Sequence, residues 1–174
     1  MLSLGVIEPC QSPWNSPVCL VRKPGKNRLC LDSRKLNSLT VKDAFPLPHI
    51  EGLLSRLEDT HYISSVDLKD AFWQVPLSNK DREKTAFTIP SMGHYQFTRM
   101  PFGLCNAAQT MSKLMDRVFP HELRDHIFVY LDDLLVVSKT LNHHFQLLEE
   151  VAKRLRSANL TINVKKSHFC FKKL

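Results

Sequence analysis

Asp132 and Asp133, two adjacent carboxylates between apolar runs, are the residues best suited to chemistry. The runs 127–131 and 134–137 are rich in β-branched and aromatic residues, which predicts two buried strands with the Asp pair at the hairpin tip. Asp-Asp is a poor choice for a tight turn, and two like charges raise each other's pKa unless something neutralises them. A divalent cation such as Mg²⁺, which takes hard oxygen ligands, is the economical explanation. The alternative is a solvated turn that is merely acidic.

Asp67 is a third carboxylate in a position typical of functional groups. The segment 61–68 predicts a strand that delivers Asp67 at its C-terminal end, where a turn begins. Turns that follow strands commonly carry ligands or catalytic groups. Taken alone, Asp67 could equally be a helix N-cap.

A basic hairpin is predicted near the N-terminus, with strands at 18–21 and 28–31 and a turn at 24–27. It gathers four cations: Arg22, Lys23, Lys26 and Arg28. Their mutual repulsion destabilises the fold unless an anion binds to them, and a nucleoside triphosphate would be such an anion. The alternative is a basic turn that aids solubility.

The composition excludes several classes of protein. With 174 residues, of which 43% are hydrophobic and 24% charged, the chain can bury a core and is not expected to be disordered. Its net charge of +7 favours a polyanionic partner, although the charge alone is weak support. The five cysteines include no C-x-x-C pair, so we expect small buried thiols rather than a zinc site or disulfides. No signal peptide or membrane-length apolar run is present, which predicts an intracellular protein that is neither secreted nor membrane-bound.

The elements that must position these groups alternate irregularly between strands and helices. Residues 1–20 predict an extended surface segment, because prolines punctuate it, and 32–37 predict a short polar connection. A second hairpin is expected to join 85–90 to 94–99. Helical patterns are expected at four places: about 48–59, 79–84, about 106–118 and 141–158. This order predicts the α+β class with a mostly antiparallel sheet packed on helices.

The helix at 141–158 is predicted to be amphipathic and to end at a cap on Asn159. The side chains expected on its apolar face are Phe145, Leu148, Val151, Ala152 and Leu155.

Six segments, taken in order, resemble the motifs of the reverse transcriptases of gypsy-type LTR retrotransposons, in their fingers and palm. The segments are 12–18, 28–37, 66–74, 84–87, 100–107 and 130–133. The chain departs from the usual pattern at Ser33, where the family commonly has Tyr, and at 108–111, where Ala-Gln-Thr-Met replaces Pro-Ala-Thr-Phe. We expect neither departure to touch a metal.

The resemblance implies a two-metal centre. Asp67 and Asp132 would bridge two Mg²⁺ ions about 3.5–4 Å apart, for which Mn²⁺ can substitute. Asp133 would assist, and the carbonyl of Leu68 would complete a coordination shell. Each carboxylate must be ionised to bind metal, so activity should fall in acid.

The resemblance also implies a deoxynucleotide pocket. Lys23 and Arg28 would hold the β- and γ-phosphates, and the ring of Phe72 would exclude a 2′-OH, although core packing is the alternative for any Phe. The other residues expected to line this pocket are Asp70, Ala71, Phe102 and Gly103. Lys166 would be a possible general acid for pyrophosphate. The residues expected to contact primer or template are Tyr130, Arg34 and Asn106.

The predicted function is therefore the core of an RNA-directed DNA polymerase from a retrotransposon Pol polyprotein, in a cytoplasmic particle or the nucleus. Its expected partners are dNTPs, a primed RNA or DNA template, and thumb, connection and RNase H regions that the chain lacks. The chain is expected to be one domain, with fingers at about 1–41 and 75–106 and an incomplete palm at about 42–74 and 107–174. One alternative is a truncated or domesticated remnant that binds nucleic acid or protein without polymerising. A viral RNA-dependent RNA polymerase is disfavoured by Phe72 and Tyr130.

Overall fold

The computed structural model describes residues 1–23, 26–46 and 60–172, and the chain divides into two compact units. Unit 1 comprises Met1–Asp43 and Phe72–Ala107, and unit 2 comprises Ala44–Ala71 and Ala108–Leu174. The helix expected at 48–59 and the centre of the turn expected at 24–27 lie outside the described residues. In the described segments, no helix combines the length and the apolar character needed to cross a membrane.

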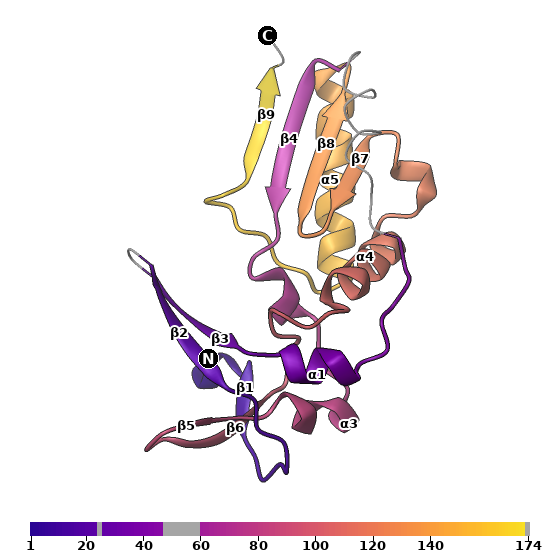
Figure 1. The fold of residues 1–174 in the computed structure, drawn as a ribbon. Coiled ribbons are helices and arrows are strands. Elements are labelled where there is room, and N and C mark those ends of the chain that lie inside the picture. The colour runs from indigo at the N-terminus through magenta and orange to yellow at the C-terminus, as the bar shows by residue number, and fades with distance from the viewer. Residues whose placement is uncertain (24–25, 47–59, 173–174) are drawn as a thin grey trace. The chain divides into compact units, whose positions relative to one another are not determined.

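Unit 1 contains a three-stranded antiparallel sheet and a separate two-stranded ribbon (Figure 1). The sheet has the order β1-β6-β5, from β1 (Ile7–Pro9), β6 (Gly93–Phe97) and β5 (Phe87–Ile89). The ribbon pairs β2 (Val18–Lys23) with β3 (Lys26–Leu31). Both predicted hairpins of this unit are confirmed.

Two expectations for unit 1 are wrong. Residues 1–20 do not simply lie extended on the surface, because β1 pairs with β6 and places the nearly inaccessible Ile7 in a core with Phe87 and Phe97. Burial of this apolar side chain favours sheet pairing over solvent exposure. The polar stretch predicted as a connection forms the first part of a helix, α1 (Arg34–Leu39). The Asp32 carboxylate accepts the backbone N–H of Arg34 at 3.2 Å, which satisfies one of the free donors that a helix start exposes.

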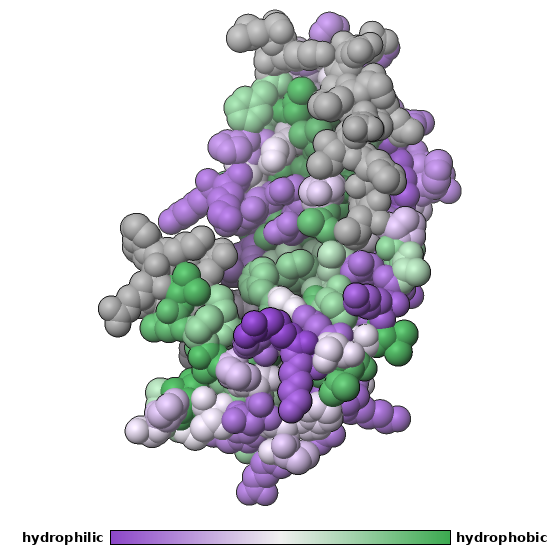
Figure 2. Space-filling view, in the orientation of Figure 1, coloured by the Kyte–Doolittle hydropathy of each residue, from purple (hydrophilic) through white to green (hydrophobic). Residues whose placement is uncertain are grey.

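The described part of residues 1–107 also contains short helical segments: η1 (Leu2–Leu4), η3 (Ala71–Gln74), α3 (Asn79–Arg82) and η4 (Glu83–Thr85). The helical turn expected at 79–84 is thus confirmed as α3 followed by η4. The β2–β3 ribbon shows hydrophobic side chains in the view of Figure 2, and Leu20 and Val21 on β2 are exposed.

Unit 2 is a four-stranded antiparallel sheet of order β7-β8-β4-β9, with α5 lying across one face (Figure 1). Its strands are β4 (Tyr62–Asp67), β7 (Ile127–Tyr130), β8 (Asp133–Ser138) and β9 (His168–Lys172). The helical segments among its described residues are η5 (His121–Leu123), α5 (Leu141–Ser157) and α4 (Ala107–Val118), which begins at the boundary between the units. The strands predicted before Asp67 and around the Asp pair, and the helices predicted at 106–118 and 141–158, are confirmed.

The buried face of α5 differs from the predicted one. His144, Leu147, Val151 and Leu155 are buried, whereas Phe145 is 54% exposed and Ala152 is also exposed. The prediction was wrong because it did not count a histidine as a core residue. The predicted buried face was therefore shifted around the helix axis. The end of the helix is as expected: Asn159 adopts a positive φ of 56° and its N–H donates to the carbonyl of Arg156 at 3.0 Å.

His144 is accommodated in the core because both of its ring nitrogens have partners. Nε2 lies 2.7 Å from Ser64 Oγ on β4, and Nδ1 lies 3.0 Å from Ser138 Oγ on β8. Since the Ser138 hydroxyl donates to the carbonyl of Thr140, Nδ1 carries the proton and Nε2 accepts from Ser64. Burial, with a smaller effect of His143, lowers the pKa of His144, so the ring is neutral and ties α5 to two strands.

All five cysteines are free thiols, as expected. The expectation that they are buried is wrong: Cys19 is exposed on β2, and the other four are half-buried.

Candidate active site

Three residues with carboxylate side chains lie at one end of the unit 2 sheet. β4 ends at Asp67, β8 begins at Asp133, and the antiparallel register pairs these two residues directly. Side chains of directly paired residues lie on the same face of a sheet. The N–H of Leu68 donates to the carbonyl of Asp132 at 3.0 Å, which brings the third carboxylate residue to the same edge.

The hairpin tip is displaced by one residue from the predicted Asp pair. Tyr130 pairs with Asp133, so the two-residue loop consists of Leu131 and Asp132. Leu131 takes the positive φ, 56°, that a two-residue hairpin requires. This conformation costs a leucine about 1–2 kcal/mol, and in return Asp133 enters the strand in register with Asp67.

The electrostatics of this edge show an excess of negative charge. Burial, followed by the charges of Asp132 and Asp67, raises the pKa of Asp133, and Lys166 opposes the effect. Lys166 Nζ lies 3.6 Å from Asp67 Oδ2. The Lys166 side chain is 68% exposed and the Asp67 side chain 18%, so the lysine approaches from the solvent side.

A segment after α5 holds Asp67 from both sides, and sequence reasoning missed it. The N–H of Asp67 donates to Ser167 Oγ at 3.1 Å, and the carbonyl of Asp67 accepts the N–H of Asn163 at 2.8 Å. The N–H of Lys69 donates to the carbonyl of Thr161 at 3.0 Å. These contacts are mostly backbone hydrogen bonds between segments that are distant in sequence, so no local residue pattern predicts them.

Phe72 and Phe102, which were expected around the nucleotide sugar and base, form an aromatic group with Trp73 in unit 1. The ring of Phe102 lies edge-on to Phe72 at 5.2 Å and to Trp73 at 6.1 Å between centroids. Phe102 is 47% exposed, so its ring is accessible to a ligand. Gly103 follows with a φ of 96°, which favours glycine.

Asn37 positions this glycine loop, and its role was not predicted. Its Nδ2 donates to the carbonyl of Gly103 at 2.8 Å, and its Oδ1 accepts the N–H of Cys105 at 2.9 Å. The side chain thus acts as a bridge to two backbone groups 66 and 68 residues away.

Two residues expected to contact primer or template are engaged within the chain. Asn106 Nδ2 donates to the carbonyl of Val41 at 2.8 Å, and its Oδ1 accepts the N–H of Asp43 at 3.0 Å. The guanidinium of Arg34 holds the Asp32 carboxylate at 2.6 Å and brings its pKa down to about 2. Arg34 itself is 91% exposed.

The structure describes only some of the other residues that were predicted to belong to the site. Tyr130 is exposed at the end of β7, Ala71 is buried, and Asp70 has a positive φ of 46°. Lys23 and Arg28 lie on β2 and β3, but their side chains are outside what the structure describes.

The donor set at the sheet edge fits a divalent cation in chemistry and charge. Among the described residues, no three His, Cys, Asp or Glu side chains already form a metal-binding cluster. Three carboxylates and the backbone carbonyl of Leu68 are nonetheless the hard oxygen donors that Mg²⁺ takes. Burial is the main cause of the raised pKa of Asp133, and the charges of Asp132 and Asp67 add to it, so a bound cation would favour the ionised carboxylate.

The sequence is similar to known proteins over nearly its whole length. Residues 21–174 match the family described as reverse transcriptase (RNA-dependent DNA polymerase). The chain is 37% identical to the Retrovirus-related Pol polyprotein from transposon 297 and 35% identical to that from transposon gypsy, both of Drosophila melanogaster. Each match covers 97% of the chain but only 16% and 17% of the polyproteins.

A solved structure confirms the α+β fold. The chain superposes on a foamy viral protease-reverse transcriptase in complex with double-stranded DNA with a TM-score of 0.90 and 30% identity, over 99% of the chain and 30% of that protein. Since the family match spans most of the chain, the protein belongs to the reverse transcriptase family, with gypsy-type retrotransposon Pol polyproteins among its relatives.

Proposed function

We propose that the chain carries the nucleotidyl-transfer centre of an RNA-directed DNA polymerase of a retrotransposon Pol polyprotein. The observation that supports this most strongly is the register that pairs Asp67 with Asp133 beside Asp132. Asp67 is far in sequence from the adjacent Asp132 and Asp133, and phosphoryl transfer with metal ions requires such carboxylates at one place. We assign unit 1 to the fingers and unit 2 to the palm.

In this proposal the metal ligands are Asp67, Asp132, Asp133 and the carbonyl of Leu68. Bound Mg²⁺, as two ions, would neutralise the charge on the triphosphate and lower the pKa of the attacking hydroxyl. The primer 3′-oxygen forms a bond to the α-phosphorus of the dNTP, and the bond between that phosphorus and pyrophosphate breaks. Lys166, whose exposed side chain can move, would give a proton to the leaving pyrophosphate.

The proposal also assigns residues to deoxynucleotide recognition. Phe72, held edge-on by Phe102, would leave no room for a 2′-OH, and Lys23 and Arg28 would hold the phosphates. The other pocket residues in the proposal are Asp70, Ala71 and Gly103. Tyr130 is exposed beside Asp133 and would contact the primer, whereas Arg34 and Asn106 would reach nucleic acid only if their present bonds rearrange.

A primer-extension assay tests the proposal. The 174-residue chain, and a longer protein that contains it, are given a primed RNA template, Mg²⁺ and dNTPs or rNTPs. We expect dNTP incorporation that Asp132→Asn abolishes and that Asp81→Asn retains, because Asp81 pairs with Lys84 on the surface of unit 1. Phe72→Val should admit rNTPs.

A binding measurement separates the metal site from turnover. Electron paramagnetic resonance of added Mn²⁺ should show ions bound to wild type and to Asp81→Asn but lost from Asp132→Asn. Equal Mn²⁺ binding by all three proteins would contradict the metal assignment. In the described residues, nothing favours a remnant that binds nucleic acid without polymerising, and the compartment we propose is intracellular.

A further inference from the structure

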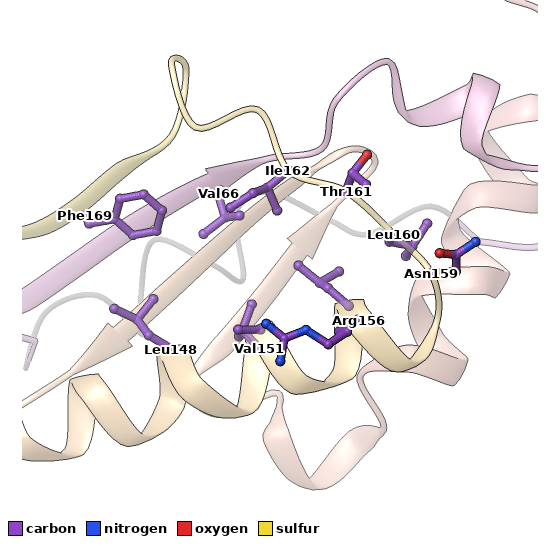
Figure 3. A pocket seen from close by; sticks show the side chains of 11 residues that line it. Val66, Leu148, Val151, Arg156, Asn159, Leu160, Thr161, Ile162 and Phe169 are labelled. Atoms are coloured by element: carbon purple, nitrogen blue, oxygen red, sulfur yellow. The ribbon is translucent and has the colours of Figure 1, made fainter. Parts of the chain in front are cut away.

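A pocket of about 430 Å³ lies in unit 2 between α5 and the segment that leads to β9 (Figure 3). Its walls are mainly apolar: Val66 comes from β4, Val151 and Leu155 from α5, Ile162 from the connecting segment and Phe169 from β9. The volume is within the range of roughly 300–1,000 Å³ that small-molecule sites occupy. The carboxylates of the candidate active site are not among its lining residues.

Arg156 is the one charged side chain among the described residues that line this pocket. It runs along α5 toward Val151 in Figure 3. Its neighbour Arg154 is held by Glu150 at 2.5 Å, but Arg156 has no carboxylate partner in the described part of the chain. A guanidinium beside an apolar cavity recognises a carboxylate or sulfonate through paired N–H donors. The pocket therefore suits a molecule with an apolar body and one anionic group.

The wall of the pocket is bonded to the strand that carries Asp67. Thr161, which lines the pocket, accepts the N–H of Lys69 at 3.0 Å, and Ile162 forms a β-bridge with Leu68. The next residue, Asn163, donates its N–H to the carbonyl of Asp67 at 2.8 Å. A ligand that packs against this wall adds contacts to the segment that holds Asp67.

We propose that this pocket binds an amphiphilic monoanion, such as a fatty acid or an aromatic carboxylate of two or three rings, and that the bound molecule stabilises the position of Asp67. A ligand that binds the folded state stabilises the parts of the fold it contacts. The binding half of the proposal is independent of the polymerase function, whereas the regulatory consequence rests on it.

Two fluorescent probes test the binding half. 8-Anilino-1-naphthalenesulfonate carries an apolar body and a sulfonate, and N-phenyl-1-naphthylamine is its neutral counterpart. Arg156→Gln should lower the affinity for the anionic probe about fivefold, as expected for the loss of an exposed ion pair. The affinity for the neutral probe should stay unchanged. Lys153→Gln, which removes an equal charge from the same helix outside this pocket, should change neither.

Ala152→Phe is the occlusion variant. Ala152 lines the pocket but is exposed, so a larger side chain can fill the cavity without disturbing the core. It should abolish the binding of both probes while circular dichroism and thermal unfolding stay unchanged. Undiminished binding by this variant, or equal effects of Arg156→Gln and Lys153→Gln on the anionic probe, would overturn the pocket assignment.

Hydrogen exchange tests the coupling. The backbone amides of Lys69 and Asn163, whose bonds join the wall to the Asp67 strand, should exchange at least threefold more slowly with saturating anionic probe, as a bound ligand protects the fold. They should not slow in Ala152→Phe. Unchanged or faster exchange in wild type would overturn the coupling. These readouts need no catalysis, so a chain that binds and protects but does not extend primers would refute the polymerase function alone.

Discussion

In unit 2, strand pairing places Asp67 and Asp133, whereas in unit 1 the side chain of Asn37 places the loop of Gly103. The β4–β8 pairing extends over six residue pairs, so its register depends on no single side chain. The glycine loop depends on two hydrogen bonds from one amide. The contrast teaches that the carboxylate site should tolerate changes in its surroundings better than the aromatic site does.

The largest expected effect is on activity, from Asp67→Asn. The variant keeps the backbone pairing but loses a charged metal ligand, so we expect primer extension to fall by about 10³-fold or more, equivalent to several kcal/mol of transition-state stabilisation. Thermal unfolding should show a folded protein. Activity within tenfold of wild type would remove Asp67 from the metal site.

Asn37→Ala and Ser167→Ala compare the two kinds of support directly. Asn37→Ala removes two hydrogen bonds and leaves two backbone groups without them, which should cost about 2 kcal/mol of unfolding free energy. Ser167→Ala removes the acceptor of the Asp67 N–H and should cost about 1 kcal/mol, because the strand pairing remains. Urea denaturation measures both, and a larger loss for Ser167→Ala would reverse the comparison.

Gly103→Ala tests whether backbone conformation alone demands glycine in the loop. A Cβ at this position would have its nearest contacts at 3.6 Å and 3.7 Å, which is ordinary van der Waals distance. The expected cost is therefore only the positive φ, about 1 kcal/mol. Gly5→Ala is the control, since Gly5 also has a positive φ and open space around it. A much greater loss at Gly103 in urea denaturation would mean that the loop is more tightly packed than its distances indicate.

The smallest expected effect is the pH dependence of stability at Asp133. Its pKa is raised in the folded state, so its contribution is most favourable below the unfolded value of 3.8 and is lost as pH rises through the folded value. Without metal, Asp133→Asn should therefore have a higher Tm than wild type at neutral pH, with the difference vanishing in acid. Mg²⁺ should stabilise wild type more than the variant. A Tm difference independent of pH would contradict the electrostatic account.

Local patterns predicted most elements of the active-site unit correctly. The β-branched runs that flank Asp132 and Asp133 predicted the β7–β8 hairpin, and apolar spacing predicted α4 and α5. The predictions were wrong where polar residues have structural roles. The polar residues of α1 were predicted to form a connection rather than a helix, and His144 was not predicted to be part of the core. The structure does not describe the side chains of Lys23 and Arg28 or the helix expected at 48–59. The roles of the two side chains and the presence of this helix therefore remain predictions.

By itself the sequence determined the α+β class, the family and the candidate carboxylates, because strand and helix periodicity and ordered motifs are properties of neighbouring residues. Only the tertiary structure decided that Asp67 pairs with Asp133, that Leu131 takes the strained turn conformation, and that Asn163 and Ser167 hold Asp67. These depend on the register between segments up to 100 residues apart, and a shift of one residue would send each side chain to the opposite face.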